Sequence, residues 1–129
     1  MQADCRRAIA YIAARLSLGR DVGEIYDPGT GAGHIYSGEF GQHAIRVYDY
    51  VRSCQLVGCR GALYDSAMRT PIQLCVTGHE FYGYDYACHR RFAGYVTESS
   101  VSFFDAAEGR WVLYRHRAGL PRSAAADGS

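Results

Sequence analysis

The stretch RVYDY at residues 46–50 places an aromatic residue directly before an aspartate, and the same pair returns along the chain. It occurs again in EIYDP (24–28), ALYDS (62–66), YGYDY (82–86) and SFFDA (102–106). The five aspartates, Asp27, Asp49, Asp65, Asp85 and Asp105, are spaced 22, 16, 20 and 20 residues apart. Recurrence at a nearly fixed interval is typical of a repeated structural unit. We therefore interpret the aspartates as five structural corners rather than five catalytic groups.

Each aromatic–Asp pair ends a segment in which apolar and other residues alternate. Ile45 and Val47 alternate with Arg46 and Tyr48, and PIQLCVTG (71–78) and SVSFFD (100–105) show the same period of two. This period is typical of β-strands. An aspartate at a strand end can accept a hydrogen bond from the N–H two residues on, which forms an Asx-turn. We expect antiparallel hairpin repeats over residues 22–115, with the aromatic residue of each pair on one face and the residue before it on the other.

The N-terminal segment shows the period of an amphipathic helix. Cys5, Ile9, Ile12 and Leu16 lie on one face, which predicts a helix over residues 4–18. Asp4 is expected to be its N-cap and Gly19 its C-terminal stop. The arginines at positions 6, 7 and 15 lie off the apolar stripe.

Together these segments predict a mainly β protein with one N-terminal helix, of the α+β class. Because both faces of the repeats carry apolar or aromatic residues and one helix covers only one face, the sheet must curl or form layers. We expect an antiparallel meander of about five hairpin repeats, curled into a barrel-like or two-layer sheet with the helix packed on it. The chain of 129 residues is expected to be a single domain, with residues 119–129 as a disordered tail. The predicted core comprises Ile9, Ile12, Leu16, Val47, Leu63, Leu74, Val76 and Phe103.

Composition narrows the classes of partner and compartment. The net charge is +1, and all 14 basic residues are arginine, which favours a GC-rich, bacterial coding sequence. We therefore expect neither a nucleic-acid partner nor a membrane partner. The odd count of five cysteines favours free buried thiols and a soluble cytoplasmic protein.

The spacing of the Tyr–Asp pairs resembles that of the YD repeats of Rhs-type bacterial proteins, whose strands spiral into a shell. The resemblance in spacing covers residues 24–114. The Gly–Arg that usually follows the aspartate in those repeats is absent after Asp49, Asp65 and Asp85, and EGRW at 108–111 is a near copy. The resemblance concerns repeat logic, and we infer no function from it.

Motifs for catalysis, cofactors or metals are weak, so we assign no catalytic residue, no cofactor and no metal ligand. GTGAG at 29–33 lacks the Lys-Ser/Thr of a phosphate-binding loop. Cys75 and His79 would lie ~13 Å apart on one strand, which is too far for one ion.

The aromatic row is the candidate binding surface. A row of tyrosines suits either a half-exposed outer covering or contact with a ligand. We hypothesise a non-catalytic binding or assembly module for a protein partner, a glycan or a second copy in a homodimer. A small hydrolase-like enzyme with a dispersed His/Asp/Glu site remains the alternative. The candidate binding residues are Tyr26, Tyr48, Tyr64, Tyr84, Phe104 and Trp111.

Overall fold

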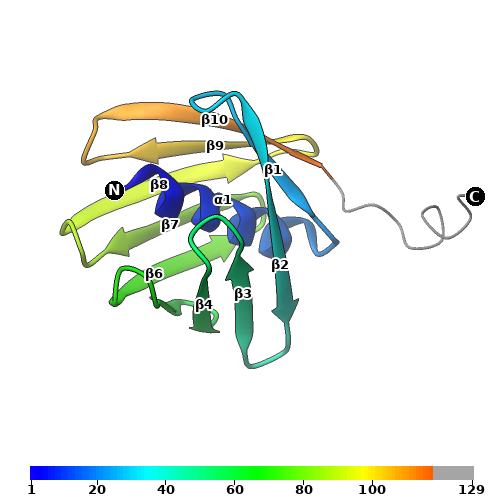
Figure 1. Cartoon of the computed structure of the whole chain (residues 1–129), viewed down its shortest axis with the longest axis vertical. Helices are drawn as coiled ribbons and strands as arrows, with labels where there is room; N and C mark the ends of the chain where they lie inside the picture. Colours follow the sequence, from blue (N-terminus) through cyan, green and yellow to red (C-terminus); the bar gives the residue numbers. More distant parts are fainter. Residues whose placement is uncertain (118–129) are drawn as a thin grey trace, which may run out of the picture.

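The computed structural model describes residues 1–117, which form one helix and a closed antiparallel barrel of ten strands (Figure 1). Each strand pairs with its neighbours in sequence, and β1 closes the barrel by pairing with β10. The predicted fold class, a meander with one N-terminal helix, is therefore confirmed. The predicted tail at 119–129 lies outside the described residues. The elements are α1 (Ala3–Leu18), β1 (Glu24–Asp27), β2 (Ala32–Phe40), β3 (Ile45–Asp49), β4 (Cys54–Cys59), β5 (Ala62–Asp65), β6 (Thr70–Thr77), β7 (Glu80–Asp85), β8 (Arg90–Val96), β9 (Ser100–Asp105) and β10 (Arg110–Arg117).

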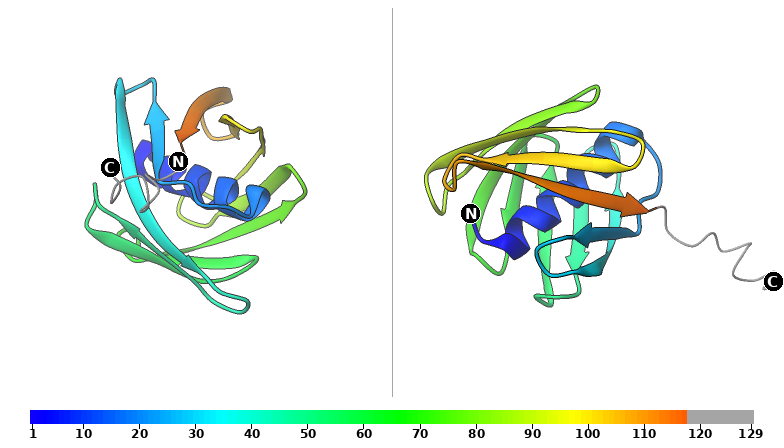
Figure 2. Two further views of the ribbon diagram at one scale, coloured as in Figure 1. Left: turned by 90° about the vertical axis from the view of Figure 1, so that its right-hand side faces the viewer. Right: turned by 90° about the horizontal axis from the view of Figure 1, so that it is seen from above.

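Helix α1 lies inside the barrel, and the two views of Figure 2 show strands on all sides of it. Every residue from Cys5 to Ala14 is buried, whichever side of the helix it occupies. Alanines at positions 8, 10, 13 and 14 allow the surrounding strands to approach the helix axis closely. Enclosure lets a single helix pack at once against β1, β2, β6, β8, β9 and β10. Within residues 1–117, no helix is both long and apolar enough to cross a membrane.

The structure shows that two arginines of this helix are buried, and it corrects the expected N-cap. Arg6 and Arg7 lie off the apolar stripe in sequence, yet both are buried, because a helix inside a barrel has no solvent-facing side. Asp4 is not the N-cap: α1 begins at Ala3 after Gln2, no side chain caps it, and Asp4 instead accepts a hydrogen bond from Arg7. The stop at Gly19 is confirmed, since this glycine has a left-handed conformation with φ 65°.

The core fills the space between α1 and the inner face of the sheet. Of the predicted core, Ile9, Ile12, Val47, Leu63, Leu74 and Phe103 are buried, whereas Leu16 and Val76 are only partly buried beside it. An aromatic cluster adds to this core, in which the ring of Phe103 lies 5.6 Å from that of Phe81 and 5.2 Å from that of Phe92.

All five aromatic–Asp pairs form the predicted corner. Each aspartate is the last residue of a strand, and one of its carboxylate oxygens accepts a hydrogen bond from the N–H two residues on. The partners are Gly29 (2.8 Å), Val51 (3.0 Å), Ala67 (2.9 Å), Ala87 (2.9 Å) and Ala107 (3.0 Å). The residues before the aromatic, Ile25, Val47, Leu63, Gly83 and Phe103, are all buried, as alternation requires.

The fourth residue after each aspartate has a left-handed backbone. Two of these residues are glycines, Gly31 (φ 70°) and Gly109 (φ 66°), whereas the other three are Ser53 (φ 51°), Arg69 (φ 54°) and His89 (φ 55°). Residues with a Cβ adopt this region at an energetic cost. The turn geometry therefore overrides side-chain preference in three repeats.

Glycine at these three positions should stabilise the protein. We expect Ser53→Gly, Arg69→Gly and His89→Gly each to raise the free energy of unfolding by about 0.5–1 kcal/mol, because relief of strain exceeds the added entropy of the unfolded chain. Chemical denaturation of the three single variants and of their combination would measure this. Gly31→Ala is the converse control and should destabilise; a triple glycine variant that is less stable than the parent would contradict the prediction.

Candidate functional site

The aspartate corners gather at one end of the barrel. The odd-numbered strands run in the same direction, so their aspartates surround the N-terminal half of α1. Arg7 donates to Asp27 from Nε (3.1 Å) and from Nη2 (2.9 Å). Arg6 donates to Asp105 (2.9 Å) and to the hydroxyl of Tyr114 (2.8 Å). The helix is thereby held to the first and last corners, which flank the seam where β1 meets β10.

The remaining corners have partners of their own. Arg52 donates to Asp49 (2.8 Å), and its Nη1 lies 2.9 Å from Asp65 in an ion pair whose geometry falls outside that of a hydrogen bond. The Cys5 thiol contacts Asp65 (3.4 Å); burial and the nearby carboxylate raise the pKa of this thiol, so it remains protonated and donates. The Cys88 thiol contacts Asp85 (3.3 Å).

These partners give the buried aspartates a structural role. Each carboxylate is engaged by a turn N–H and by a side chain from the helix or a turn. Among residues 1–117, no three His, Cys, Asp or Glu side chains are placed to hold a metal ion. The five cysteines form no disulfide in the structure; Cys5 and Cys54 are buried, whereas Cys59 is exposed, contrary to the expectation that the thiols are buried.

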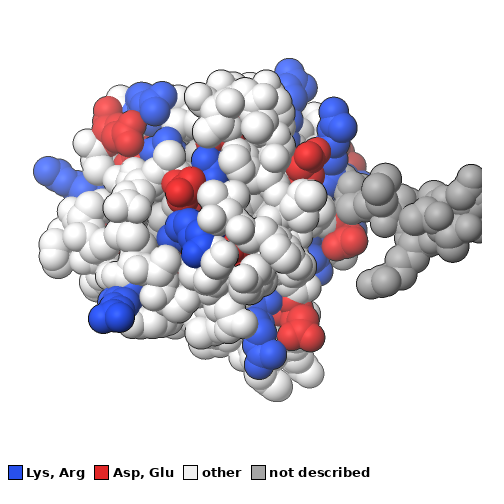
Figure 3. All heavy atoms as spheres, in the orientation of Figure 1, with Lys and Arg blue, Asp and Glu red and all other residues white. Residues whose placement is uncertain are grey.

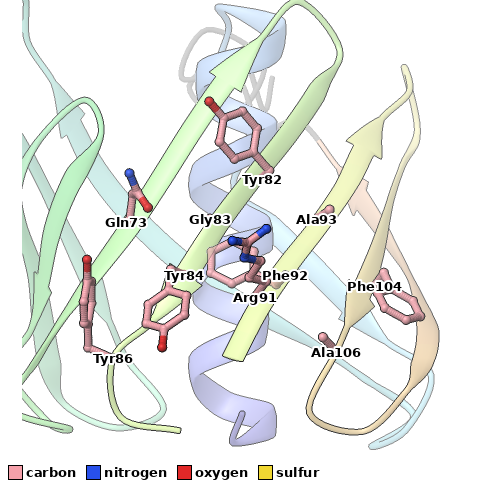
Figure 4. Close-up of a pocket in the computed structure, with 10 residues that line it drawn as sticks. All are labelled: Gln73, Tyr82, Gly83, Tyr84, Tyr86, Arg91, Phe92, Ala93, Phe104 and Ala106. Carbon is pink, nitrogen blue, oxygen red and sulfur yellow. The ribbon is translucent and has the colours of Figure 1, made fainter. Parts of the chain in front are cut away.

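A second gathering of side chains lies on the outside of the barrel, over β6–β9. Strand register places Tyr82 beside Ala93, Ala93 beside Phe104, and Phe104 beside Trp111. Because Ala93 is small and its neighbours are large, the surface is hollow there, with a volume of about 790 Å³. We call this hollow the aromatic groove; it is lined by Gln73, Tyr82, Gly83, Tyr84, Tyr86, Arg91, Phe92, Ala93, Phe104 and Ala106 (Figure 4).

Aromatic pairs build the walls of the groove. Tyr84 and Tyr86 flank Asp85 in sequence, and their rings meet edge to face with centroids 4.8 Å apart. Beyond the other wall, the ring of Trp111 lies 5.3 Å from that of Phe104 and 5.9 Å from that of Tyr95. Rings in and beside the groove are accessible, since Tyr82 is 57% exposed, Trp111 56% and Tyr95 48%, whereas Tyr84 and Phe104 are half-buried.

The predicted binding residues divide into two sets. Tyr84 and Phe104 line the groove, and Trp111 contacts Phe104. Tyr26, Tyr48 and Tyr64 also avoid the core, but they lie on β1, β3 and β5, outside the groove lining. Closure of the sheet into a barrel spreads a row that is continuous in the repeat pattern around a cylinder.

Sequence reasoning missed several lining residues, including Tyr82, Tyr86, Arg91 and Ala93. Tyr82 has a sequence signal, because it lies two residues before Tyr84 and therefore on the same strand face. Tyr86 lies two residues after Tyr84 and has the same signal, whereas Arg91 and Ala93 lack one, since the floor at Ala93 becomes visible only when strand register places it between Tyr82 and Phe104.

Arg91 is the only lining residue, within the described chain, that carries a full charge. It is exposed and is the register partner of Tyr84 on β7. Elsewhere on the surface, acidic and arginine side chains are interspersed, and uncharged atoms cover most of the face in Figure 3. The groove is therefore an aromatic surface with one positive point.

Catalytic groups do not converge on the groove. Its lining within residues 1–117 holds no carboxylate and no imidazole to act as a general base. A Ser–His contact occurs at the opposite end of the barrel from the aspartates, where Ser17 Oγ lies 3.3 Å from His79 Nδ1. There the serine donates to the carbonyl of Gly78 (2.7 Å), so its hydroxyl proton is not directed at the imidazole.

The sequence and the structure were compared with known proteins. No family model, curated protein or solved structure matches the chain.

Proposed function

We propose that this chain is a non-enzymatic binding module that holds a segment of a partner protein in the aromatic groove. The observation that carries the proposal is the floor at Ala93 between the exposed ring of Tyr82 and the half-buried ring of Phe104. The volume of the aromatic groove, about 790 Å³, falls in the range of ~300–1,000 Å³ that is usual for ligand sites.

The composition of the groove favours a protein ligand. The central parts of protein interfaces are enriched in tyrosine, tryptophan, phenylalanine and arginine and depleted in lysine and acidic residues. Tyrosine offers a large contact area with few rotatable bonds and a hydroxyl for hydrogen bonding. The lining provides three tyrosines, the half-buried Phe104 and one arginine, and Trp111 extends it.

Position on the barrel also suits a binding role. The groove residues project from paired strands, and the inner face of the same strands packs on α1 through Phe81, Phe92 and Phe103. Rigid elements hold contact residues more accurately than loops do. The outward side chains of the groove, such as those of Tyr82, Ala93 and Phe104, can therefore be replaced without disturbing the core beneath them.

Filling the groove should abolish binding while leaving the fold intact. We expect Ala93→Trp to place an indole over the floor, between Tyr82 and Phe104. The full-length protein would be used to select peptides from a phage-displayed library of random 12-residue sequences. The selected peptides should bind the parent protein at least about tenfold more tightly than Ala93→Trp, as measured by fluorescence anisotropy.

The matched control is Ala62→Trp, which adds the same indole to an exposed outer position on β5 outside the groove. It should bind the selected peptides like the parent protein, and circular dichroism should show that both variants are folded. Equal affinity of the parent and Ala93→Trp for every selected peptide, or failure to select any peptide, would contradict the proposed function.

A further inference from the structure

We propose that the groove recognises a partner segment in which an acidic residue and an apolar residue are two positions apart. The carboxylate would pair with Arg91, and the apolar side chain would sit over Ala93. This inference rests on the proposed function, and it specifies the chemistry of the segment that the groove accepts.

Among residues 1–117, the charge of Arg91 has no acidic counterpart. Some outer arginines form ion pairs, as Arg46 does with Glu39 and Arg110 with Glu108, whereas the exposed Arg60, Arg69, Arg90 and Arg115 form none within residues 1–117. Arg91 differs from those four because it lines the groove. Within residues 1–117, Arg91 forms no ion pair, and the groove lining contains no acidic side chain.

A ligand that covers the groove therefore has to satisfy this cation. Enclosing the guanidinium beneath a neutral ligand removes water from it without supplying a replacement partner, which opposes binding. A carboxylate can accept two parallel hydrogen bonds from the guanidinium, and such bidentate pairs are strong and directional. Aromatic walls strengthen the pair by lowering the local dielectric constant.

The spacing of the two recognition elements follows from β8. Arg91 and Ala93 are two residues apart on one strand face, so they are separated by about 7 Å. Side chains of residues i and i+2 in an extended peptide have the same separation and point to the same side. An acidic residue at one position and an apolar residue two positions away thus match Arg91 and the Ala93 floor.

Other occupants fit these charges less well. In a two-fold contact whose axis passes through the groove, each groove would meet the groove of its partner. Each Arg91 would then face a groove lining without a carboxylate. A nucleic acid needs several cations along its backbone, whereas the described lining offers one.

Selection with charge variants tests the inference. Peptides selected on the parent protein should be enriched in Asp or Glu two positions from Leu, Ile, Val or Phe. Arg91→Gln should lose the acidic preference but keep the apolar one, and Arg91→Glu should select Lys or Arg at the same position. For one synthetic selected peptide, replacing Glu by Gln should weaken binding to the parent about tenfold and to Arg91→Gln by less than about twofold.

Arg115→Gln provides the matched control, because Arg115 is an exposed arginine on β10 outside the groove lining. It should retain the acidic preference of the parent. Selected peptides that lack acidic enrichment but still depend on Ala93 would overturn this inference and leave the proposed function standing. Acidic preference that persists in Arg91→Gln would also overturn it, as would a neutral oligosaccharide that binds the parent but not Ala93→Trp. A dimer in sedimentation that Ala93→Trp dissociates would assign the groove to a second copy instead.

Discussion

Replacing Arg7 with leucine should lower the free energy of unfolding by about 3–5 kcal/mol, measured by chemical denaturation. Arg7 and Asp27 are both buried, and two guanidinium nitrogens donate to the same carboxylate oxygen. Removing one member of a buried pair leaves the other charge without compensation in a medium that solvates it poorly. The expected loss is therefore much larger than the worth of the intact pair.

A double variant separates the ion pair from the rest of the site. Asp27→Asn keeps an oxygen that can accept the Gly29 N–H of the Asx-turn but removes the charge that faces Arg7. Arg7→Leu/Asp27→Asn should therefore be more stable than the sum of the two single losses indicates. Strict additivity of the two losses would contradict coupling between these side chains.

An exposed ion pair on the same protein provides a comparison for the stability lost with Arg7. Arg46 and Glu39 lie 3.6 Å apart on the outside of the barrel, where 66% and 80% of their side chains are exposed. Arg46→Leu should change stability by less than about 1 kcal/mol, because exposed pairs contribute little. The same substitution thus distinguishes an arginine inside the barrel from one outside it.

The repeated corners could be predicted from sequence because they rest on local chemistry. An aspartate that follows an outward aromatic residue at a strand end must face inward, and its carboxylate reaches the N–H two residues on. The left-handed residue four positions after the aspartate had no comparable signal. Ser53, Arg69 and His89 adopt that conformation because the turn requires it, although their side chains disfavour it.

The position of the helix inside the barrel depends on the pairing of strands that are far apart in sequence. Helical periodicity identifies one apolar stripe, and Arg6 and Arg7 lie off it, so periodicity gave no indication that they are buried. Closure of β1 on β10 places the helix in the lumen, where these arginines meet the aspartates of the first and last corners. The repeat pattern places one aspartate at the end of every second strand, and these strands run in the same direction. Their five carboxylates therefore gather at one end of the barrel, which indicates that cations are buried there.

The groove required strand register, which the sequence does not encode locally. The row of tyrosines predicted an outer aromatic face, but it did not distinguish β7 and β9 from β1, β3 and β5. The groove forms over β7–β9 because the small Ala93 lies between Tyr82 and Phe104. A larger residue at this position would fill the groove. The same register places Gly83 opposite Phe92 on the inner face.

Gly83→Ala should lower the free energy of unfolding by about 3 kcal/mol, although alanine adds a single methyl group. Gly83 occupies the inward position that isoleucine, valine, leucine or phenylalanine fills in the other four repeats. The ring of Phe92 covers it from the adjacent strand, and a methyl group there would overlap both that ring and the backbone carbonyl oxygen of Gln73. The carbonyl belongs to the paired strand β6 and cannot withdraw without breaking the ladder, so the strain of overpacking is not relieved.

Two further glycines make the reason testable. Gly94 has the mirror arrangement, in which a methyl group would overlap the Phe81 ring and the carbonyl oxygen of Ser102, so Gly94→Ala should cost a similar amount. Gly33→Ala is the matched control, because a methyl group on that β2 glycine would meet only the flexible carboxylate end of Glu24. It should cost less than about 1 kcal/mol in the same denaturation experiment. If all three variants lost equal stability, the effect would reflect removal of glycine from a strand in general, and the close approach of β6 and Phe92 to Gly83 would not be its cause.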